Sequence, residues 1–306
     1  MSDESEIDTA EMPALPSSAD APWPATCSAR AQVDLAALSH QGLVRSQNED
    51  HYLVLRFGRS LETLLTNLPA GQLPARSEEI GYGIVVADGI GGGVAGEIAS
   101  RMAISTLISL VLHTPDWIIS TGEQETERWL QRMAERYRRV GAALRAHSKA
   151  DPALAGMGTT MTLACSLNAN LIIGHIGDSR AYLFRGGALH QLTRDHTLVQ
   201  SLVALGHLTA EQAASHSLRH VLTRSLGAGE CCFEGDFQRA ALSDGDQLLL
   251  CTDGLTDMVD NTTIADVLGS EASANEACQK LIALALKNGG KDNVTVALAR
   301  YRFPVS

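Results

Sequence analysis

The sequence predicts an α+β fold with antiparallel sheets covered by helices, and three observations lead to this expectation. Short apolar runs of strand length recur along most of the chain. Two of them, 180–185 and 188–192, are separated only by a Gly-Gly pair, which is typical of a two-residue hairpin. The clearest helical patterns, 96–112 and 125–147, follow one another in a block instead of alternating with strands, which argues against a parallel sheet.

The strands are predicted from apolar runs that end in glycine, aspartate or another turn residue. Residues 83–87 form a continuous apolar run, which is typical of a strand buried on both faces. The other expected strands are 32–38, 51–55, 170–176, 180–185, 188–192, 247–251 and 294–298.

The second helix, 125–147, is predicted from its periodicity. Five apolar residues fall at spacings of three and four and form one stripe: Leu130, Met133, Tyr137, Val140 and Leu144. Four arginines lie off that stripe, and we interpret them as a solvated face and not as an anion site: Arg128, Arg132, Arg136 and Arg139.

Composition narrows the class of protein. The 306 residues are 45% hydrophobic and 19% charged, which excludes a disordered or collagen-like chain. No run approaches ~18 apolar residues and the start is acidic, so we expect neither a membrane span nor a signal peptide, and a cytoplasmic location. The net charge of -11 argues against a nucleic-acid partner. The six cysteines form no C-x-x-C pair and are expected to be reduced.

The chain is expected to contain one large domain. Residues 1–30 carry six acids against one arginine, with several prolines, and predict a disordered acidic tail. The domain is expected to span 31–303. Within it, 57–80 is interpreted as an amphipathic insertion and 195–229 as a helical segment with a capping box at Thr209-x-x-Gln212.

Aspartates occur where the predicted strands begin or end. Asp88, Asp178 and Asp253 follow strands, whereas Asp50 and Asp292 precede strands. In an antiparallel sheet the end of one strand lies beside the start of its neighbour, so the five carboxylates can gather at one end. Carboxylates at close range repel one another unless a divalent cation neutralises them, and an all-oxygen ligand set suits Mg²⁺ or Mn²⁺.

Each motif taken alone has a second interpretation. The glycine-rich segment after Asp88 fits a metal loop or a plain turn, and it lacks the residues of a nucleotide-binding loop. The strings around Asp253 and Asp292 are common in turns, and the segment around Asp178 also fits a hairpin turn.

The order of the motifs is more specific than any one of them. Six occur in sequence: Arg45-x-x-Asn48-Glu49-Asp50, Asp88-Gly89-Ile90-Gly91-Gly92, Gly158-Thr159-Thr160, Gly177-Asp178-Ser179-Arg180, Asp253-Gly254-Leu255 and Asp292-Asn293. In this order they closely resemble the metal-dependent protein phosphatase 2C (PPM) family of Ser/Thr phosphatases, in its bacterial form. The resemblance covers about residues 33–300.

The resemblance implies a sandwich of two antiparallel sheets with helices on both outer faces, a four-layer αββα arrangement. It also implies a centre for two divalent ions, Mn²⁺ or Mg²⁺, in the cleft between the sheets. Six residues are the implied ligands: Asp88 as the bridge, the Gly89 carbonyl, Asp253, Asp292 and, directly or through water, Glu49 and Asp50. Asp178 matches the position of a more weakly held third ion.

The implied activity is hydrolysis of phosphoserine and phosphothreonine in proteins by a metal-bridging hydroxide, in opposition to a Ser/Thr kinase. Arg45 matches the arginine that binds the substrate phosphate, and Asp88 and Asp253 are expected to be essential for catalysis. The implied partners are phosphorylated proteins and a cognate kinase, with no nucleic acid or membrane, and the chain is expected to be a monomer. The alternative is a regulatory phosphoprotein-binding module of the same fold with little turnover; the intact motifs argue against it.

Four features qualify the resemblance. Ile90 stands where eukaryotic members often carry histidine, so no side-chain acid is expected there and a metal-bound water is the implied proton donor. His196 is interpreted as structural and not catalytic. Asn293 is expected to orient Asp292 or cap its turn. The 195–229 segment resembles the family's flap beside the cleft, where substrates are selected.

Overall fold

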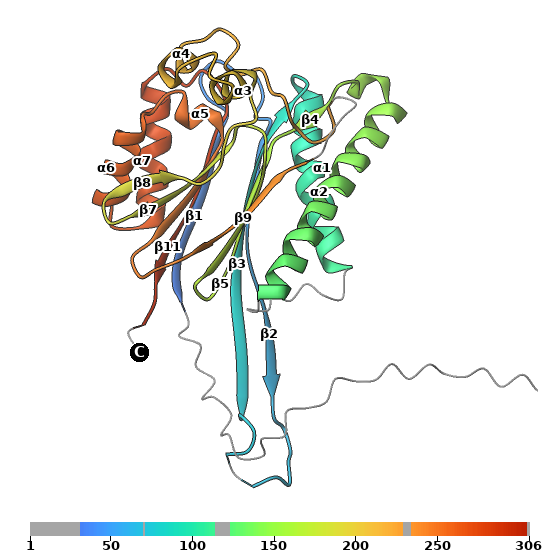
Figure 1. The fold of residues 1–306 in the computed structure, drawn as a ribbon, viewed down its shortest axis with the longest axis vertical. Coiled ribbons are helices and arrows are strands. Elements are labelled where there is room, and N and C mark those ends of the chain that lie inside the picture. The colour runs from blue at the N-terminus through green and yellow to red at the C-terminus, as the bar shows by residue number, and fades with distance from the viewer. Residues whose placement is uncertain (1–30, 70, 114–122, 229–233, 305–306) are drawn as a thin grey trace, which may run out of the picture. The chain divides into compact units, whose positions relative to one another are not determined.

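The structure, a computed structural model, describes residues 31–69, 71–113, 123–228 and 234–304 (Figure 1). The chain divides into two compact units. The larger, residues 28–59 and 78–306, contains all the described helices and the strands of both sheets except residues 60–62 and 76–77. In the smaller, residues 1–27 and 60–77, the Thr63 backbone N–H donates a hydrogen bond to the Ala75 carbonyl oxygen. The acidic tail expected at 1–30 lies outside the described residues.

Two sheets with antiparallel pairing form the centre of the larger unit. One has the strand order β1-β11-β10-β7-β8, and the other β2-β3-β5-β6-β9 with β4 paired to β3. The strands are β1 (Gln32–His40), β2 (Asp50–Glu62), β3 (Arg76–Ile90), β4 (Gly158–Thr159), β5 (Met161–Leu167), β6 (Asn170–Ile176), β7 (Arg180–Arg185), β8 (Ala188–Gln191), β9 (Asp236–Ala241), β10 (Gln247–Cys251) and β11 (Val294–Arg302).

Strand β10 shows why apolar runs form the centre of this fold. Successive side chains of a strand point to opposite faces, so a strand covered on both faces is apolar throughout. Leu248 and Leu250 belong to the core between the sheets, whereas Leu249 and Cys251 belong to the core under the helices. All four are buried, which follows from a strand paired on both sides with β7 and β11.

The helices are α1 (Val94–Leu112), α2 (Glu123–Ala150), α3 (Leu198–Ala204), α4 (Ala210–Ala214), α5 (Asp253–Thr256), α6 (Asn261–Ser270) and α7 (Ala274–Lys287), with a short 3₁₀ helix η1 (Pro152–Leu154). Side-chain caps define the N-termini of two of these helices. Thr209 and Ser273 each form a capping box with a residue three positions later, which satisfies two backbone N–H groups at the start of α4 and α7.

The layers run helix, sheet, sheet, helix (Figure 1). Helices α6 and α7 cover the outer face of the first sheet, while α1 and α2 cover the outer face of the second. The expected α+β sandwich is therefore confirmed. Helix α1 is long and apolar enough to span a membrane by length and composition alone, but Ala99, Ala103 and Leu107 on it pack in the core.

The structure adds to the predicted elements and corrects one. Strands β2 and β3 are longer than expected, so residues 57–62 and 76–80 of the expected insertion are strand. Strands β5 and β9 and helices α6 and α7 were not expected. The interpretation of Arg136 as part of a solvated face is wrong, because its side chain is only 6% exposed. Helix α2 packs against both the sheet and α1, and these two contacts bury a wider part of its surface than the single apolar stripe that its periodicity predicts.

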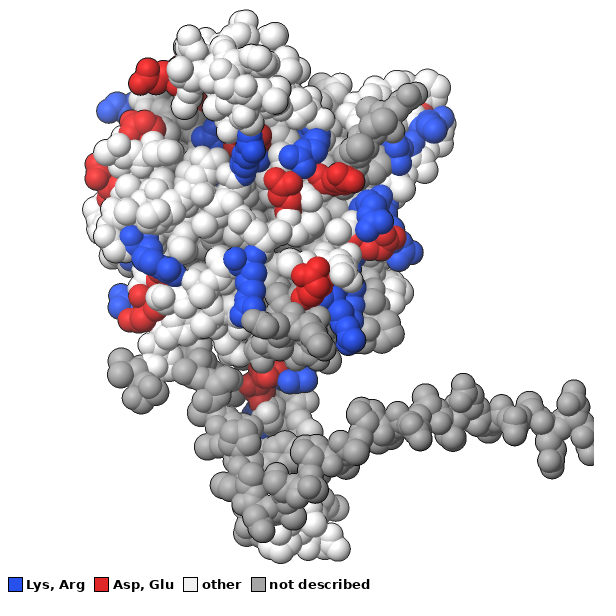
Figure 2. All heavy atoms as spheres, viewed as in Figure 1, with Lys and Arg blue, Asp and Glu red and all other residues white. Residues whose placement is uncertain are grey.

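The charged side chains are intermixed on the face seen in Figure 2, where blue basic and red acidic groups lie near one another. The net charge of -11 is therefore not gathered into one patch among the described residues of that face.

Candidate active site and metal centre

A cavity of about 690 Å³ lies in the larger unit and is lined by the ends of strands from both sheets. The sequence-predicted residues that line it are Arg45, Glu49, Asp88, Gly89, Asp178, Asp253, Asp292 and Asn293. Ile90 also lines it. Asp50 is not among the lining residues and is 4% exposed. The structure therefore brings Arg45 beside Asp292, which lies 247 positions later in the sequence.

Asp88 lies near the end of β3, and the segment 159–160 fixes its backbone. Its N–H donates to Thr160 Oγ1 at 3.0 Å, and its carbonyl oxygen accepts from Thr159 Oγ1 at 2.7 Å. Burial raises the pKa of the Asp88 carboxyl well above its ordinary value, and four nearby aspartates raise it further. Such repulsion is relieved when a cation shares the carboxylates.

Asp50 begins β2 and faces the same cluster. Its Oδ2 accepts a hydrogen bond from Thr252 Oγ1 at 2.8 Å, whereas its Oδ1 is buried without a hydrogen-bond partner. Burial raises the pKa of Asp50 to about 7, with Asp253 and Asp292 adding to the shift. A buried carboxylate oxygen without a partner is costly in an apolar interior, and it is the kind of atom that a metal ion satisfies.

Asp253 and Asp292 lie on the side of the first sheet. Asp253 follows β10, and its Oδ1 is a second buried oxygen without a partner. Asp292 precedes β11, and its Oδ2 forms an ion pair of 2.5 Å with Nη2 of Arg45. This hydrogen bond with Asp292 raises the pKa of the Arg45 guanidinium. The Arg45 side chain is 51% exposed and so remains accessible from the cavity.

Glu49 connects the cluster to the start of α1. Its Oε1 accepts a hydrogen bond from the Gly93 N–H at 2.7 Å, while its backbone carbonyl accepts from Ser100 Oγ. Close packing accompanies this contact, because a Cβ at Gly89 would lie 2.1 Å from the Gly96 carbonyl oxygen. Glycine at 89 thus lets α1 approach the strand end that carries Asp88.

Asn293 fixes the loop that carries Arg45 and Glu49. Its Oδ1 accepts from the Glu49 N–H, and its Nδ2 donates to the carbonyl oxygens of Gln41 and Gln47, each at 2.8 Å. All the described hydrogen bonds of its side chain therefore go to that loop, while its backbone N–H donates to Oδ1 of Asp292 at 2.8 Å. This geometry suits a positioning residue.

Asp178 enters the cavity from the turn between β6 and β7. Gly177 adopts a φ of +110°, and a Cβ there would lie 2.5 Å from Thr160, so only glycine fits this turn. Asp178 is 8% exposed, and burial together with Asp253 raises its pKa well above the ordinary value.

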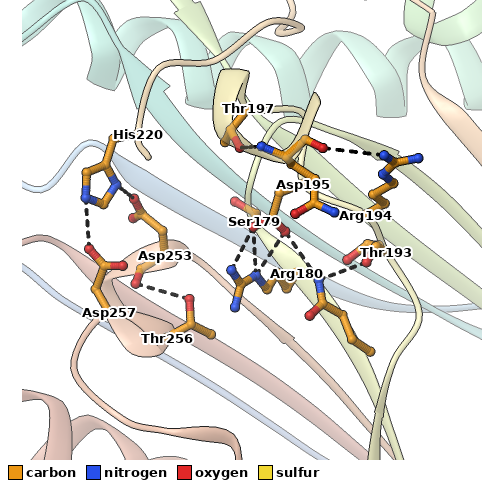
Figure 3. Close-up of polar contacts among 12 residues, drawn as sticks. Ser179, Arg180, Thr193, Arg194, Asp195, Thr197, His220, Asp253, Thr256 and Asp257 are labelled. Carbon is orange, nitrogen blue, oxygen red and sulfur yellow. Dashed lines mark hydrogen bonds and ion pairs between the residues drawn. The ribbon is translucent and has the colours of Figure 1, made fainter. Parts of the chain in front are cut away.

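His220 is a functional candidate that the sequence reasoning missed. Its Nδ1 lies 3.4 Å from Oδ2 of Asp253, and its Nε2 lies 3.2 Å from Oδ2 of Asp257 (Figure 3). Asp178, His220 and Asp253 each offer a ligand atom within 4.8 Å of the others. No motif spacing marks His220, because the segment between α4 and β9 brings it to the site through tertiary contacts.

His196 lies outside the residues that line the cavity. The ring is buried, its Nδ1 accepts from the Gly177 N–H at 3.1 Å, and its Nε2 lies 3.0 Å from Asp236 Oδ2. Burial lowers its pKa, which favours the neutral imidazole that can accept from Gly177. These contacts give His196 a structural place beside the turn that carries Asp178.

The donor set fits divalent cations. Carboxylate and carbonyl oxygens are the ligands that Mg²⁺ and Mn²⁺ prefer, and two buried carboxylate oxygens here have no protein partner. An arginine beside such a centre suits a phosphate oxygen, because its planar guanidinium donates two parallel hydrogen bonds.

A sheet sandwich with this carboxylate cluster and a nearby arginine defines the class of metal-dependent phosphate-ester hydrolases. A family model described as protein phosphatase 2C matches residues 73–288, and the chain belongs to this family.

Relatives with assigned names agree with the family. The chain is 37% identical over 215 residues to the serine/threonine phosphatase stp of Listeria monocytogenes, which is 70% of this chain and 82% of the relative. The structure of the S. agalactiae serine/threonine phosphatase superposes with a TM-score of 0.71 at 35% identity, covering 88% of this chain and 99% of the other. The catalytic domain of the phosphatase PstP in complex with two manganese ions gives a TM-score of 0.68 at 34% identity, covering 89% and 100%.

Proposed function

We propose that this chain hydrolyses phosphoserine and phosphothreonine in proteins, with two divalent cations, Mn²⁺ or Mg²⁺, bound by the carboxylate cluster. The observation that carries this proposal is the convergence of five aspartates from both sheets, two of which present buried oxygens without a partner. The family and the named relatives support protein dephosphorylation as the activity.

The ligands are proposed from the geometry and the family motifs together. When bound, the two cations supply an activated water and neutralise phosphate charge. The residues that would hold them are Asp88 between the two ions, the Gly89 carbonyl, Glu49 and Asp50 on one side, and Asp253 and Asp292 on the other. Thr252 holds Asp50 in place through its hydroxyl, and Asn293 holds the loop that carries Glu49.

Arg45 is proposed to bind the substrate phosphate. Its guanidinium lies at the cavity beside Asp292 and is half exposed, so it can turn from the carboxylate to a phosphate oxygen. Ile90 contributes no acid, and the leaving serine or threonine oxygen therefore takes its proton from another source than residue 90.

Asp178, His220 and Asp253 are proposed to form a site for a third, more weakly held cation. Nδ1 of His220 faces Asp253, while Oδ2 of Asp257 pairs with Nε2 of His220 and orients the ring (Figure 3). A carboxylate behind a metal-binding histidine fixes its tautomer and raises its basicity.

The protein partners follow from the activity. Phosphorylated proteins are the substrates, and we infer a cognate Ser/Thr kinase whose phosphorylated products this chain dephosphorylates. We also infer a monomeric state and a cytoplasmic location. Residues 31–303 are proposed as the catalytic domain. The flap-like segment 195–229, which carries α3, α4 and His220, is proposed to contribute to substrate selection.

Purified protein is expected to hydrolyse p-nitrophenyl phosphate and a phosphothreonine peptide with Mn²⁺ or Mg²⁺. Because the cations supply the activated water, chelation with EDTA should lower turnover by at least ~10²-fold, and added Mn²⁺ should restore it. Full turnover after exhaustive chelation would contradict the proposal. Saturable binding of the phosphopeptide with no turnover in Mn²⁺ would instead support the regulatory binding module.

A further inference from the structure

His196 joins two segments that carry ligands of the proposed third-cation site. The turn at 177–180 carries Asp178, and the segment 220–224 begins with His220. The imidazole of His196 is buried and lines neither of the two cavities that Asp178 and His220 share. A group in this place acts on a bound cation only through the residues that it holds.

On the side of Asp178, residues 196 and 177 form a reciprocal pair of hydrogen bonds. The backbone N–H of His196 donates to the Gly177 carbonyl oxygen at 2.7 Å, and the Gly177 N–H donates to Nδ1 of His196 at 3.1 Å. The second bond is buried, so its loss would leave a backbone N–H without a partner. Because Gly177 immediately precedes Asp178, the ring fixes the backbone from which that carboxylate extends.

The other ring nitrogen connects this pair to the segment of His220. A backbone N–H only donates, so Nδ1 of His196 is unprotonated and Nε2 carries the hydrogen. Nε2 lies 3.0 Å from Oδ2 of Asp236, and Oδ1 of the same carboxylate accepts from Nη1 of Arg224 at 2.9 Å. The His196 carbonyl oxygen also accepts from the Thr223 N–H at 2.8 Å. His196 is therefore bonded to the turn of Asp178 directly and to the segment of His220 on two routes.

We propose that His196 is a positioning residue that sets the cation affinity of the third site by holding the turn of Asp178 against the segment of His220. This inference rests on the third-cation site of the proposed function. A ligand that points at its site for only part of the time raises the apparent dissociation constant in proportion. Loss of the Nδ1 acceptor frees the backbone before Asp178 and has this effect.

The two tighter cation sites should depend little on His196. Thr160 fixes the backbone of Asp88, and Thr252 holds the carboxylate of Asp50. Neither of these hydrogen bonds involves the His196 ring. A change confined to the third site therefore distinguishes positioning of Asp178 from a general loss of structure.

Two substitutions at position 196 separate the two ring contacts. His196→Asn places an amide oxygen near the position of Nδ1 and keeps an acceptor for the Gly177 N–H. His196→Gln reaches toward Asp236 and leaves that N–H without an acceptor. Titration calorimetry on the full chain measures Mn²⁺ affinity at the third site after the two tighter sites are filled. The affinity should fall by at least ~10-fold in His196→Gln and stay within ~3-fold of the wild type in His196→Asn, because an unsatisfied buried donor is costly.

Two further variants complete the experiment. Asp178→Asn removes a ligand, so it should abolish the third binding event and thereby identify it. His190 is exposed on β8 and lines neither cavity. His190→Gln is therefore the matched control, and its three Mn²⁺ affinities should equal those of the wild type.

Three results would overturn the inference: no third binding event in the wild type, equal third-site affinities of His196→Asn and His196→Gln, or a loss of affinity at all three sites together in His196→Gln. Turnover of p-nitrophenyl phosphate in excess Mn²⁺ is measured on the same samples. Metal-dependent turnover in a wild type that binds only two ions would refute the role of His196 and leave the proposed function intact. Absence of both turnover and Mn²⁺ binding would refute the proposed function itself.

Discussion

Replacing Asp88 with asparagine should lower the turnover of p-nitrophenyl phosphate by at least ~10³-fold, because several kcal/mol of cation-dependent stabilisation depend on this carboxylate. Asp88 is the residue whose pKa is raised by four other aspartates, so it lies at the centre of the cluster. Asparagine has nearly the same shape and cannot bridge two cations through charged oxygens.

The stability of the Asp88→Asn variant separates this role from a folding defect. Without metal, its unfolding temperature should equal or exceed that of the wild type, because one carboxylate is removed from a repelling group. Mn²⁺ should raise the unfolding temperature of the wild type and have little effect on the variant. Asp266→Asn, on the exposed face of α6, is the control and should behave as the wild type. A variant that retained both turnover and Mn²⁺ stabilisation would remove Asp88 from the metal centre.

Arg45→Ala should raise the KM for a phosphopeptide by about 10- to 100-fold, because a charged hydrogen bond contributes about 1.5–3 kcal/mol. The Arg45 guanidinium lies 2.5 Å from Asp292 at the cavity and has no buried structural role, since half of the side chain is exposed. Binding of Mn²⁺, measured by calorimetry, should be retained.

Lys291→Ala is the matched control for Arg45. Lys291 lines the same cavity, and its replacement removes the same positive charge. Its ammonium group, however, lacks the planar fork with which an arginine pairs with two phosphate oxygens. Its KM should change by less than about 3-fold, as expected for an exposed charge. Equal effects of the two substitutions would indicate a general electrostatic attraction in place of a specific phosphate contact.

The strands whose bounds the sequence predicts best are those that end at a turn residue. Strands β6, β7 and β10 have the predicted bounds, because each is an apolar run that a turn residue follows. Strand β9 carries exposed and half-buried residues, so its hydrophobic signal is weak. Helix α7 had a usable signal in the capping box of Ser273 and Glu276.

The site was predictable where it depends on strand ends and unpredictable where it depends on loops. The aspartates lie together because antiparallel pairing places the start of β2 and β11 near the ends of β3, β6 and β10. His220 comes from a segment that no strand or helix orders, and only tertiary packing places it beside Asp253. The burial of Arg136 is unpredictable for a similar reason, because periodicity predicts one buried stripe on α2 and not the additional packing of α2 against α1.

The most direct test of the metal centre is an anomalous difference map from crystals grown with saturating Mn²⁺, recorded at the manganese absorption edge. We expect two strong peaks that share the Asp88 carboxylate, one toward Asp50 and one toward Asp253. A weaker third peak is expected between Asp178 and His220. A map with no peak beside Asp88, in a protein that hydrolyses p-nitrophenyl phosphate under the same conditions, would show that Asp88 does not bind the catalytic cations.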